Sequence, residues 1–279
     1  RSSRGYARHA WFFRPLFRRF ALFCVQTEAD AGRIRRVLGT AATNIHVCGT
    51  MKFDQLPPAP SAETDEGPDD WFGRDAIVWT AGSTHCGEEA VVCDAFSELR
   101  KEFPGLRLVL VPRHQERAAE VQRLLEERGL RHAVRKPRPG SRQPPPAETD
   151  VLLVNTTGEL MKFYAASDLV FVGKSLAGNA GGHNIIEPAI LGKAILHGAA
   201  MQNFRAVAAA FAEREAVVVL HGDHELLPAV RRLCASPEIR RQLGVRALRT
   251  VEECGGAMER TLNCLLPVIE GDRDRTMES

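Results

Sequence analysis

The sequence predicts an α/β fold in which helices cover both faces of a parallel sheet. Short β-branched runs, typical of strands that are buried on both faces, alternate with helical segments between residues 76 and 220. A glycine-rich loop at residues 173–182 follows one of these runs and precedes a helix. This alternation favours a doubly wound parallel sheet, which binds ligands where its strands end.

The elements follow from local patterns along the chain. Strands are predicted at residues 21–25, 44–48, 76–80, 106–111, 151–154, 168–172, 194–197 and 216–220. Helices are predicted at residues 28–38, 88–103, 115–128, 159–166, 185–192, 224–235, 237–253 and 257–266. Thr27 is a suitable cap for the first helix, and apolar residues spaced from Val91 to Leu99 give the second a face that can pack on a sheet.

The chain divides into a short first part and a longer second part. Residues 1–50 hold only a strand, a helix and a strand, which we interpret as the remnant of an N-terminal Rossmann-like domain. Residues 51–72 contain prolines and an acidic run, as linkers do. Residues 73–279 are predicted to form a C-terminal Rossmann-like domain. Because the first residue is Arg1 rather than Met, we expect an N-terminally truncated protein.

Composition and missing motifs argue against several classes of function. The net charge of +2 gives no reason to expect nucleic acid binding. The seven cysteines include no CxxC pair, which is typical of reduced thiols in a cytoplasm. No signal peptide and no apolar run long enough to cross a bilayer is present. The sequence lacks HExxH and any Cys/His array, so no metal is expected. It also lacks GxxxxGK[ST] and GxSxG, which argues against an NTPase and an α/β-hydrolase. We expect no cofactor.

Residues 1–20 mix arginine with aromatic residues. A basic aromatic segment can lie on an anionic membrane surface. It can equally form a surface helix whose aromatic side packs on its own domain. In either case Pro15 is expected to interrupt any long helix. Both interpretations stay open, and nucleic acid is not favoured as a partner.

The glycine-rich loop is the densest polar feature of the chain. It contains Gly173, Gly178, Gly181 and Gly182. Asn184 can cap the helix that follows, with Glu187 in its first turn. The free N–H groups of a helix start bind anions and hydroxyl groups, and a nearby carboxylate suits a ribose diol. We therefore interpret the loop as part of a nucleotide or nucleotide-sugar site, and the alternative is a tight packing turn.

Other polar clusters also follow predicted strands, and these loops share one edge of the sheet. The clusters are Ser83, Thr84 and His85; Arg113 and His114; Asn155, Thr156, Thr157, Gly158 and Glu159; and Ser175, Gly181, Gly182, His183, Asn184 and Glu187. Arg113 offers a planar fork suited to a phosphate. Together the clusters predict a nucleotide pocket, although each alone could be a surface ion pair or a structural imidazole.

Several of these residues belong to longer motifs. The motifs are GTMKFD (49–54), AGSTHCGEE (81–89), VPRH (111–114), TTGELMKFYAASD (156–168), FVGKSL (171–176), GGHNIIEPA (181–189) and MQNF (201–204), which adds Asn203 as a candidate. From about residue 10 to Leu266, the chain resembles the 3-deoxy-D-manno-octulosonic acid (Kdo) transferases.

The resemblance implies a GT-B fold, in which two Rossmann-like domains face each other across a cleft. The C-terminal domain would bind the donor CMP-Kdo, and the N-terminal domain would receive a lipid A precursor (lipid IVA). The reaction would invert the sugar without a metal, in lipopolysaccharide biosynthesis on the cytoplasmic side of the bacterial inner membrane.

The resemblance also assigns roles to residues of this chain. It places the CMP contacts at Pro112, Arg113, Thr157, Gly158, Glu159, Asn184, Ile185, Ile186 and Glu187. Lys52 would steady charge in the transition state. The family's general base, a glutamate early in the N-terminal domain, has no counterpart in these residues. We therefore expect the 279-residue chain to bind CMP or CMP-Kdo without transferring the sugar.

The chain departs from the family at some positions, and other functions fit the same pocket. Thr50, Thr157, Lys174 and Ile185 stand where Asn, Met, Gly and Pro are usual. Lys174 either favours a phosphate or faces solvent. Another GT-B transferase or epimerase that uses a UDP-sugar is one alternative function. A non-catalytic nucleotide-binding or membrane-associated module is another.

Overall fold

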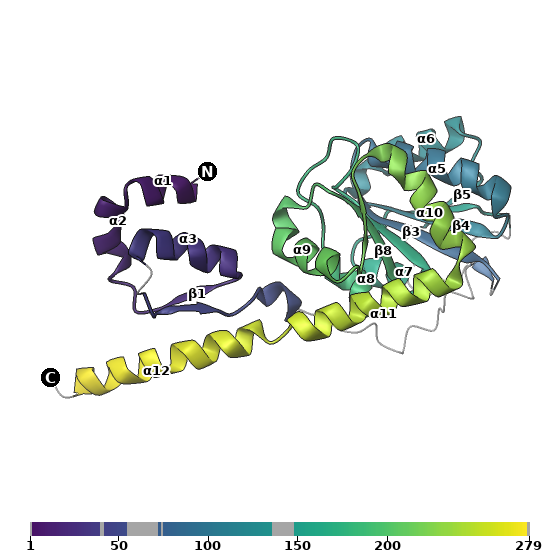
Figure 1. The fold of residues 1–279 in the computed structure, drawn as a ribbon. Coiled ribbons are helices and arrows are strands. Elements are labelled where there is room, and N and C mark those ends of the chain that lie inside the picture. Colours follow the sequence, from purple (N-terminus) through teal and green to yellow (C-terminus); the bar gives the residue numbers. More distant parts are fainter. Residues whose placement is uncertain (1, 40–41, 55–71, 74, 136–147, 278–279) are drawn as a thin grey trace. The chain divides into compact units, whose positions relative to one another are not determined.

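The computed structural model describes residues 2–39, 42–54, 72–73, 75–135 and 148–277. Most of the predicted linker at residues 51–72 lies outside these ranges. The chain forms two compact units (Figure 1). We call Leu56–Glu252 the sheet unit, and we call Arg1–Gln55 with Glu253–Ser279 the terminal unit. Each is described by itself.

The sheet unit contains a seven-stranded sheet in the order β5-β6-β4-β3-β7-β8-β9, with all neighbouring strands parallel (Figure 1). The strands are β3 Ile77–Thr84, β4 Leu106–Pro112, β5 His132–Arg135, β6 Val151–Val154, β7 Leu169–Val172, β8 Ala194–Gly198 and β9 Val218–Leu220. Strands β4, β5 and β6 lie on one side of β3, and the later strands β7, β8 and β9 lie on its other side. The order of the strands therefore reverses beside β3, where ligands bind in folds of this type.

Helices alternate with the strands, as the sequence predicts. They are α5 Glu88–Glu102, α6 Ala118–Glu127, α7 Leu160–Ala165, α8 Ile186–Ile190, α9 Arg205–Glu213, α10 Leu226–Ala235 and α11 Pro237–Cys254. Shorter 3₁₀ turns lie at η2 Gln115–Arg117, η3 Gln202–Phe204 and η4 Asp223–Glu225.

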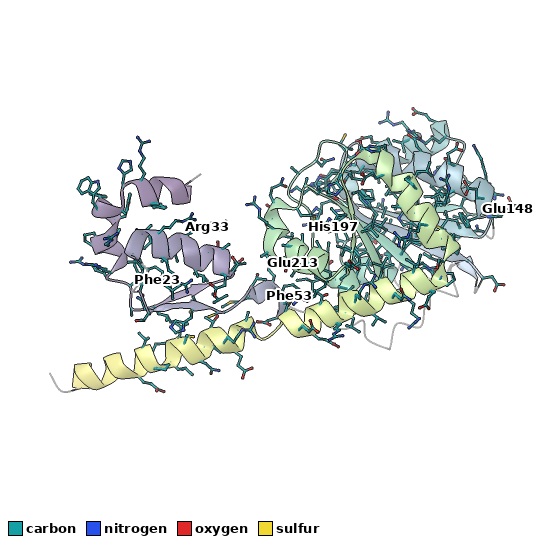
Figure 2. All side chains as sticks on the ribbon, viewed as in Figure 1. Phe23, Arg33, Phe53, Glu148, His197 and Glu213 are labelled. Atoms are coloured by element: carbon teal, nitrogen blue, oxygen red, sulfur yellow. The ribbon has the colours of Figure 1, made fainter. Side chains whose placement is uncertain are left out.

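Both faces of the sheet are buried. Trp79 and Leu108 belong to a core that includes residues of α5, α6 and α10, whereas Val78 and Val109 pack with Phe163 of α7. Adjacent strand residues point to opposite faces, so apolar residues at successive positions fill both layers (Figure 2). Each fully buried large apolar side chain contributes about 1.5–3 kcal/mol to stability. The predicted doubly wound parallel sheet is confirmed.

The terminal unit contains a parallel two-stranded sheet. Its elements are α1 Ser2–Arg8, α2 Ala10–Phe17, β1 Phe23–Val25, α3 Glu28–Leu38, β2 Ile45–Val47, η1 Met51–Phe53 and α12 Ala257–Met277. The predicted cap of α3 is present, because the Asp30 N–H donates to Thr27 Oγ1 at 3.2 Å.

The division differs from the predicted one at the C-terminal end, since residues 253–279 group with the N-terminal residues. Both carboxylate oxygens of Asp54 accept hydrogen bonds at the start of α12, from the Gly256 and Met258 N–H groups at 2.6 Å. The Arg260 side chain donates to the Cys48 carbonyl at 2.9 Å. These polar contacts join α12 to the end of β2 and to η1.

Two further differences affect the sheet. The predicted loop at residues 81–87 is partly strand, because β3 continues to Thr84 with a register shift between Gly82 and Thr84. Strand β5 was not predicted, because its residues His132–Arg135 lack a clear apolar alternation. It adds to the sheet by pairing with β6.

Candidate functional site

A pocket of about 270 Å³ lies where β3, β4 and β7 end. It is lined by Ser83, Arg113, Gly158, Leu160, Met161, Tyr164, His183, Asn184 and Glu187. The lining residues come from the loops or strand ends after β3, β4, β6 and β7, together with α7 and α8. The predicted convergence of these loops is therefore present. Ser83, Arg113, Gly158, His183, Asn184 and Glu187 are the predicted residues that share it.

Arg113 brings positive charge to this pocket. Pro112 is buried at the end of β4, and the Arg113 N–H donates to the Thr84 carbonyl at 2.9 Å, which fixes the backbone beside β3. The Arg113 side chain is exposed, and no acidic side chain of the described residues forms an ion pair with it. An unneutralised guanidinium at a pocket wall suits a phosphate.

Asn184 and Glu187 line the same pocket. Asn184 Oδ1 accepts from the Ile186 N–H at 3.1 Å, and its Nδ2 donates to Glu187 Oε1 at 3.2 Å. Burial raises the pKa of Glu187, while the bond from Asn184 and the charge of Arg113 act in the opposite direction. The side chains of Ile185 and Ile186 are fully buried, so these two residues can reach a ligand only through their backbone.

The turn after β6 supplies Gly158, which adopts φ +82, a conformation that glycine favours. Thr157 is exposed beside it. The Glu159 carboxylate is held by Arg135 at 2.8 and 3.1 Å and by the Thr156 hydroxyl. The hydrogen bond from Arg135 lowers the pKa of Glu159. Glu159 does not line the pocket, so its contact with a nucleotide stays a prediction.

Several predicted residues support the loops instead. The Ser175 hydroxyl donates to the Val172 carbonyl and accepts from the Gly198 N–H, both at 2.9 Å. Gly181 donates to Gln202 Oε1 at 2.7 Å, and its carbonyl accepts from the Asn203 N–H. A side chain at Gly182 would collide with Met201. Thr84 is fully buried in the strand, so the prediction that it lies in a loop is wrong.

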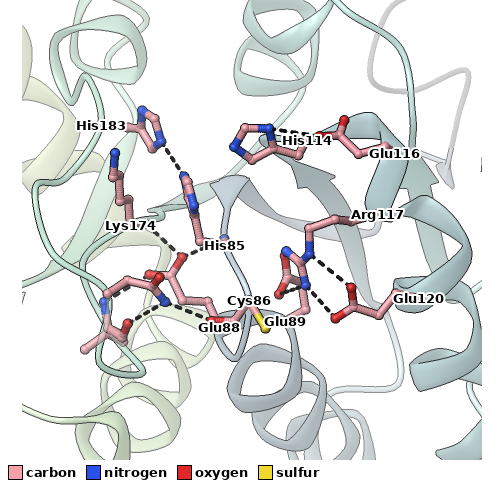
Figure 3. A network of polar contacts seen from close by, with 12 residues as sticks. His85, Cys86, Glu88, Glu89, His114, Glu116, Arg117, Glu120, Lys174 and His183 are labelled. Atoms are coloured by element: carbon pink, nitrogen blue, oxygen red, sulfur yellow. Dashed lines mark hydrogen bonds and ion pairs between the residues drawn. The ribbon is translucent and has the colours of Figure 1, made fainter.

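Glu88 is the main residue that the sequence interpretation missed. Its carboxylate is fully buried and accepts four backbone hydrogen bonds (Figure 3). One oxygen accepts from His85 at 2.9 Å and from Lys174 at 2.8 Å, and the other from Ser175 at 2.8 Å and Leu176 at 3.0 Å. Burial raises the pKa of Glu88 although these bonds favour the ionised form. Glu88 thus ties the loop after β7 to the loop after β3.

Gly173 allows the same two loops to approach closely. A Cβ atom there would lie 2.5 Å from the Ser83 carbonyl oxygen, which is closer than side chains come. Ser83 itself adopts φ +54 beside the register shift of β3. Bulges of this kind redirect side chains near binding sites. Here Ser83 lines the pocket, whereas the next residue, Thr84, is buried.

The floor of the pocket was also missed. It includes Leu160, Met161 and Tyr164 of α7. Tyr164 is almost fully buried, and burial raises the pKa of its hydroxyl. A side chain at Gly82 would lie 2.3 Å from that hydroxyl. The apolar spacing of the helix after Gly158 could have indicated these residues.

His183, which lines the pocket, belongs to a group of three histidines with His85 and His114 (Figure 3). The ring nitrogens Nε2 of His85 and His183 are 3.0 Å apart, and the His114 ring lies edge-on to His85. Burial lowers the pKa of His183 to about 4, and it also lowers the pKa of His85. The neighbouring cations Lys174, Arg113 and His114 act in the same direction.

Lys52 lies in η1 of the terminal unit, where its N–H donates to Thr50 Oγ1 at 3.4 Å. Its role at a transition state stays a prediction. Within the described ranges, no group of three or more histidine, cysteine or acidic side chains is arranged to hold a metal ion. Nor does any helix there combine the length and apolarity needed to cross a membrane.

Comparison with known proteins links this chain to a family. Residues 1–55 match the family described as 3-deoxy-D-manno-octulosonic-acid transferase (kdotransferase). Over 271 residues the chain is 29% identical to the 3-deoxy-D-manno-octulosonic acid transferase of Haemophilus influenzae, covering 97% of this chain and 62% of that protein. Over 243 residues it is 32% identical to the transferase of the same name from Bordetella pertussis, covering 86% of this chain and 55% of that protein. The chain spans less than two thirds of the length of these relatives.

A solved structure of a single domain is also similar to this chain. The crystal structure of the C-terminal CMP-Kdo binding domain of WaaA from Acinetobacter baumannii is 30% identical, with a TM-score of 0.59. The match covers 64% of this chain and 90% of that domain. The predicted GT-B type of fold is thereby confirmed. This chain belongs to the 3-deoxy-D-manno-octulosonic acid (Kdo) transferase family.

Proposed function

We propose that the pocket binds CMP-Kdo and that the chain is the donor-binding part of a glycosyltransferase. The observation that carries this proposal is that one pocket is lined both by Arg113, which has no ion-pair partner among the described residues, and by the hydrogen-bonded Asn184 and Glu187. A nucleotide site needs a cation that binds the phosphate and a hydrogen-bond acceptor for the ribose hydroxyls. Similarity to a solved CMP-Kdo binding domain supports the choice of nucleotide sugar.

The roles divide along the pocket. Arg113 holds the phosphate of the donor, and Glu187 accepts from the ribose hydroxyls while Asn184 keeps its carboxylate in place. The backbone at Gly158 and Ile186 supplies further polar contacts. Pro112, Thr157, Glu159 and Ile185 complete the proposed CMP contacts. Because Arg113 can neutralise the leaving phosphate, the transfer needs no metal. Inversion at the sugar is proposed from the family resemblance.

The acceptor is a lipid A precursor at the cytoplasmic face of the bacterial inner membrane, and Lys52 steadies the transition state. These assignments rest on the family resemblance. A protein that consists of the 279 residues alone binds the donor without transferring it, because the sequence holds no counterpart of the general-base glutamate. Transfer of labelled Kdo to a lipid A precursor by that protein at a normal rate would contradict this assignment.

Helix α2 supports the membrane assignment. Trp11 is 78% exposed and Phe12 62% exposed, whereas Phe17 packs on the small core of the terminal unit. Arg18 and Arg19 follow directly and are also exposed. Exposed aromatic rings beside arginines suit the interface of an anionic bilayer. We therefore propose that Phe17 packs on its own domain and that Trp11 and Phe12 face the membrane.

Changing Arg18 and Arg19 together to Ala is expected to weaken binding to anionic vesicles. Each arginine near such a surface contributes about 1 kcal/mol, so the double variant should lose at least about tenfold in partitioning. Co-sedimentation with phosphatidylglycerol vesicles measures this loss. The control changes Arg33 and Arg36 of α3 to Ala, which removes the same charge from exposed positions elsewhere. Equal binding by both double variants would overturn the membrane assignment.

CMP is expected to raise the melting temperature of the protein more than UDP does at equal concentration. A ligand that binds only the folded state stabilises it in proportion to the logarithm of its concentration over its Kd. A titration followed by thermal denaturation measures the two shifts. A larger shift with UDP would favour a transferase or epimerase that uses a UDP-sugar and would overturn the choice of CMP-Kdo.

A further inference from the structure

The carboxyl ends of β4, β3 and β7 carry a cluster of three histidines and one lysine, whose rings feel the charge of Arg113. It consists of His85 after β3, His114 after β4, and Lys174 and His183 after β7 (Figure 3). The His85 and His183 rings are stacked with centroids 5.2 Å apart, and the His114 ring is 5.5 Å from His85. Figure 3 shows the Lys174 side chain extending beside the His85–His183 pair.

The acidic side chains near this cluster are already engaged. Glu88 accepts four backbone N–H groups, and Glu89 is paired with Arg117 at 2.8 Å. Glu116 lies 3.3 Å from His114 Nδ1. Among the described residues, no acidic side chain forms an ion pair with the Lys174 ammonium or the Arg113 guanidinium. Lys174 in the cluster and Arg113 near it are therefore two cations without an acidic ion-pair partner among the described residues.

The His85–His183 pair also favours an anion at this place. Only one proton fits between two ring nitrogens that are 3.0 Å apart, so one ring donates and the other accepts. Burial and the charges of Lys174, His114, Arg117 and Arg113 oppose a second proton. An anion that reached the pair would reverse this effect, because it stabilises the imidazolium form.

The backbone at Lys174 is unusual as well. The residue adopts φ +63, a conformation that side chains other than those of glycine and asparagine rarely adopt. Glu88 holds it there by accepting from its N–H at 2.8 Å. The fold thus keeps a lysine where glycine would be favoured on conformational grounds. A functional use of the ammonium group explains this choice better than a side chain that merely faces solvent.

We propose that Lys174 and the His85–His183 pair form a second anion subsite, which binds the carboxylate of the sugar acid in the donor. The inference rests on the proposed function, and it places the sugar acid next to His183, which lines the pocket. In an activated Kdo, the carboxylate and the phosphate oxygen are attached to the same carbon. Two adjoining anions therefore meet two adjoining cations, with Arg113 on the phosphate and Lys174 on the carboxylate.

The test is the ratio of the Kd for CMP to the Kd for CMP-Kdo, measured by calorimetry on the whole chain. CMP lacks the carboxylate, so the ratio isolates the subsite. Lys174→Gly removes the ammonium while suiting the backbone conformation, and Lys174→Asn is a second variant that tolerates it. The control is Lys101→Ala, at an exposed lysine of α5. The ratio is expected to fall about tenfold in both Lys174 variants and to stay unchanged in the control.

A pH series gives a second readout. Burial lowers the pKa of His183 to about 4 in the free protein, and a bound carboxylate raises this pKa. At a pH between the pKa of the free protein and that of the complex, binding is therefore coupled to the uptake of a proton. The affinity for CMP-Kdo is therefore expected to rise as the pH falls from 7 to 5. In His183→Asn this rise should be smaller.

The outcomes separate this inference from the proposed function. Binding of CMP with an unchanged ratio in the Lys174 variants overturns the subsite and leaves the donor pocket intact. Failure of both CMP and CMP-Kdo to bind the unaltered chain overturns the proposed function and the subsite together.

Discussion

Replacing Glu88 with Ala is expected to cost about 3–5 kcal/mol of unfolding free energy and to abolish nucleotide binding. The carboxylate is fully buried and is the acceptor for the N–H groups of His85, Lys174, Ser175 and Leu176. Each buried N–H that loses its acceptor costs about 1–3 kcal/mol, and the gain from no longer burying a charge offsets part of the sum. A domain of this kind has only about 5–15 kcal/mol in total.

Urea unfolding measures this loss. Glu88→Gln is expected to be destabilising too, by about 2 kcal/mol, because its NH₂ group would face two backbone N–H groups. Glu98→Ala is the matched control on the same helix, where an exposed carboxylate pairs only with Lys101. Its effect should stay within about 0.5 kcal/mol. Equal stability of Glu88→Ala and Glu98→Ala would show that the loops hold their positions without Glu88.

Replacing Arg113 with Ala is expected to weaken CMP binding between about tenfold and a hundredfold. A charge-assisted hydrogen bond to a phosphate contributes about 1.5–3 kcal/mol, and every 1.4 kcal/mol corresponds to a factor of ten. Arg113→Lys should recover part of the affinity, because it keeps the charge but loses the planar fork. Since the Arg113 side chain is exposed, folding should be unaffected.

Calorimetric titration with CMP measures the change. Arg107→Ala is the matched control, since Arg107 lies near the start of β4, the strand that precedes Arg113, and donates to the Pro104 and Leu106 carbonyls away from the pocket. An affinity of Arg113→Ala within twofold of the unaltered protein, with a normal control, would remove Arg113 from the phosphate position.

Local patterns were sufficient for most of the sheet unit. The buried strands are continuous β-branched runs, so their positions and parallel pairing follow from the sequence. Side chains that bond to their own neighbourhood were also predictable. Asn184 accepts from Ile186, and Thr27 accepts from the Asp30 N–H. Each such bond spans only a few residues, and the spacing alone indicates it.

Long-range partners could not be predicted in this way. Glu88 resembles an ordinary first-turn carboxylate, but its acceptor oxygens serve a loop that lies 86 to 88 residues later. Asp54 reaches the start of α12 across 202 residues. Ser175 has the composition of a binding loop and instead joins two strands. In each case the fold, rather than the local sequence, selects the partner.

A crystal structure of the chain with CMP tests the central claim most directly. We predict the phosphate within hydrogen-bond distance of the Arg113 guanidinium and the ribose hydroxyls on the Glu187 carboxylate. The sheet unit also holds a larger pocket of about 360 Å³, lined in part by His197, Gln202 and Arg205. CMP bound there, with the Arg113 pocket empty, would contradict the account.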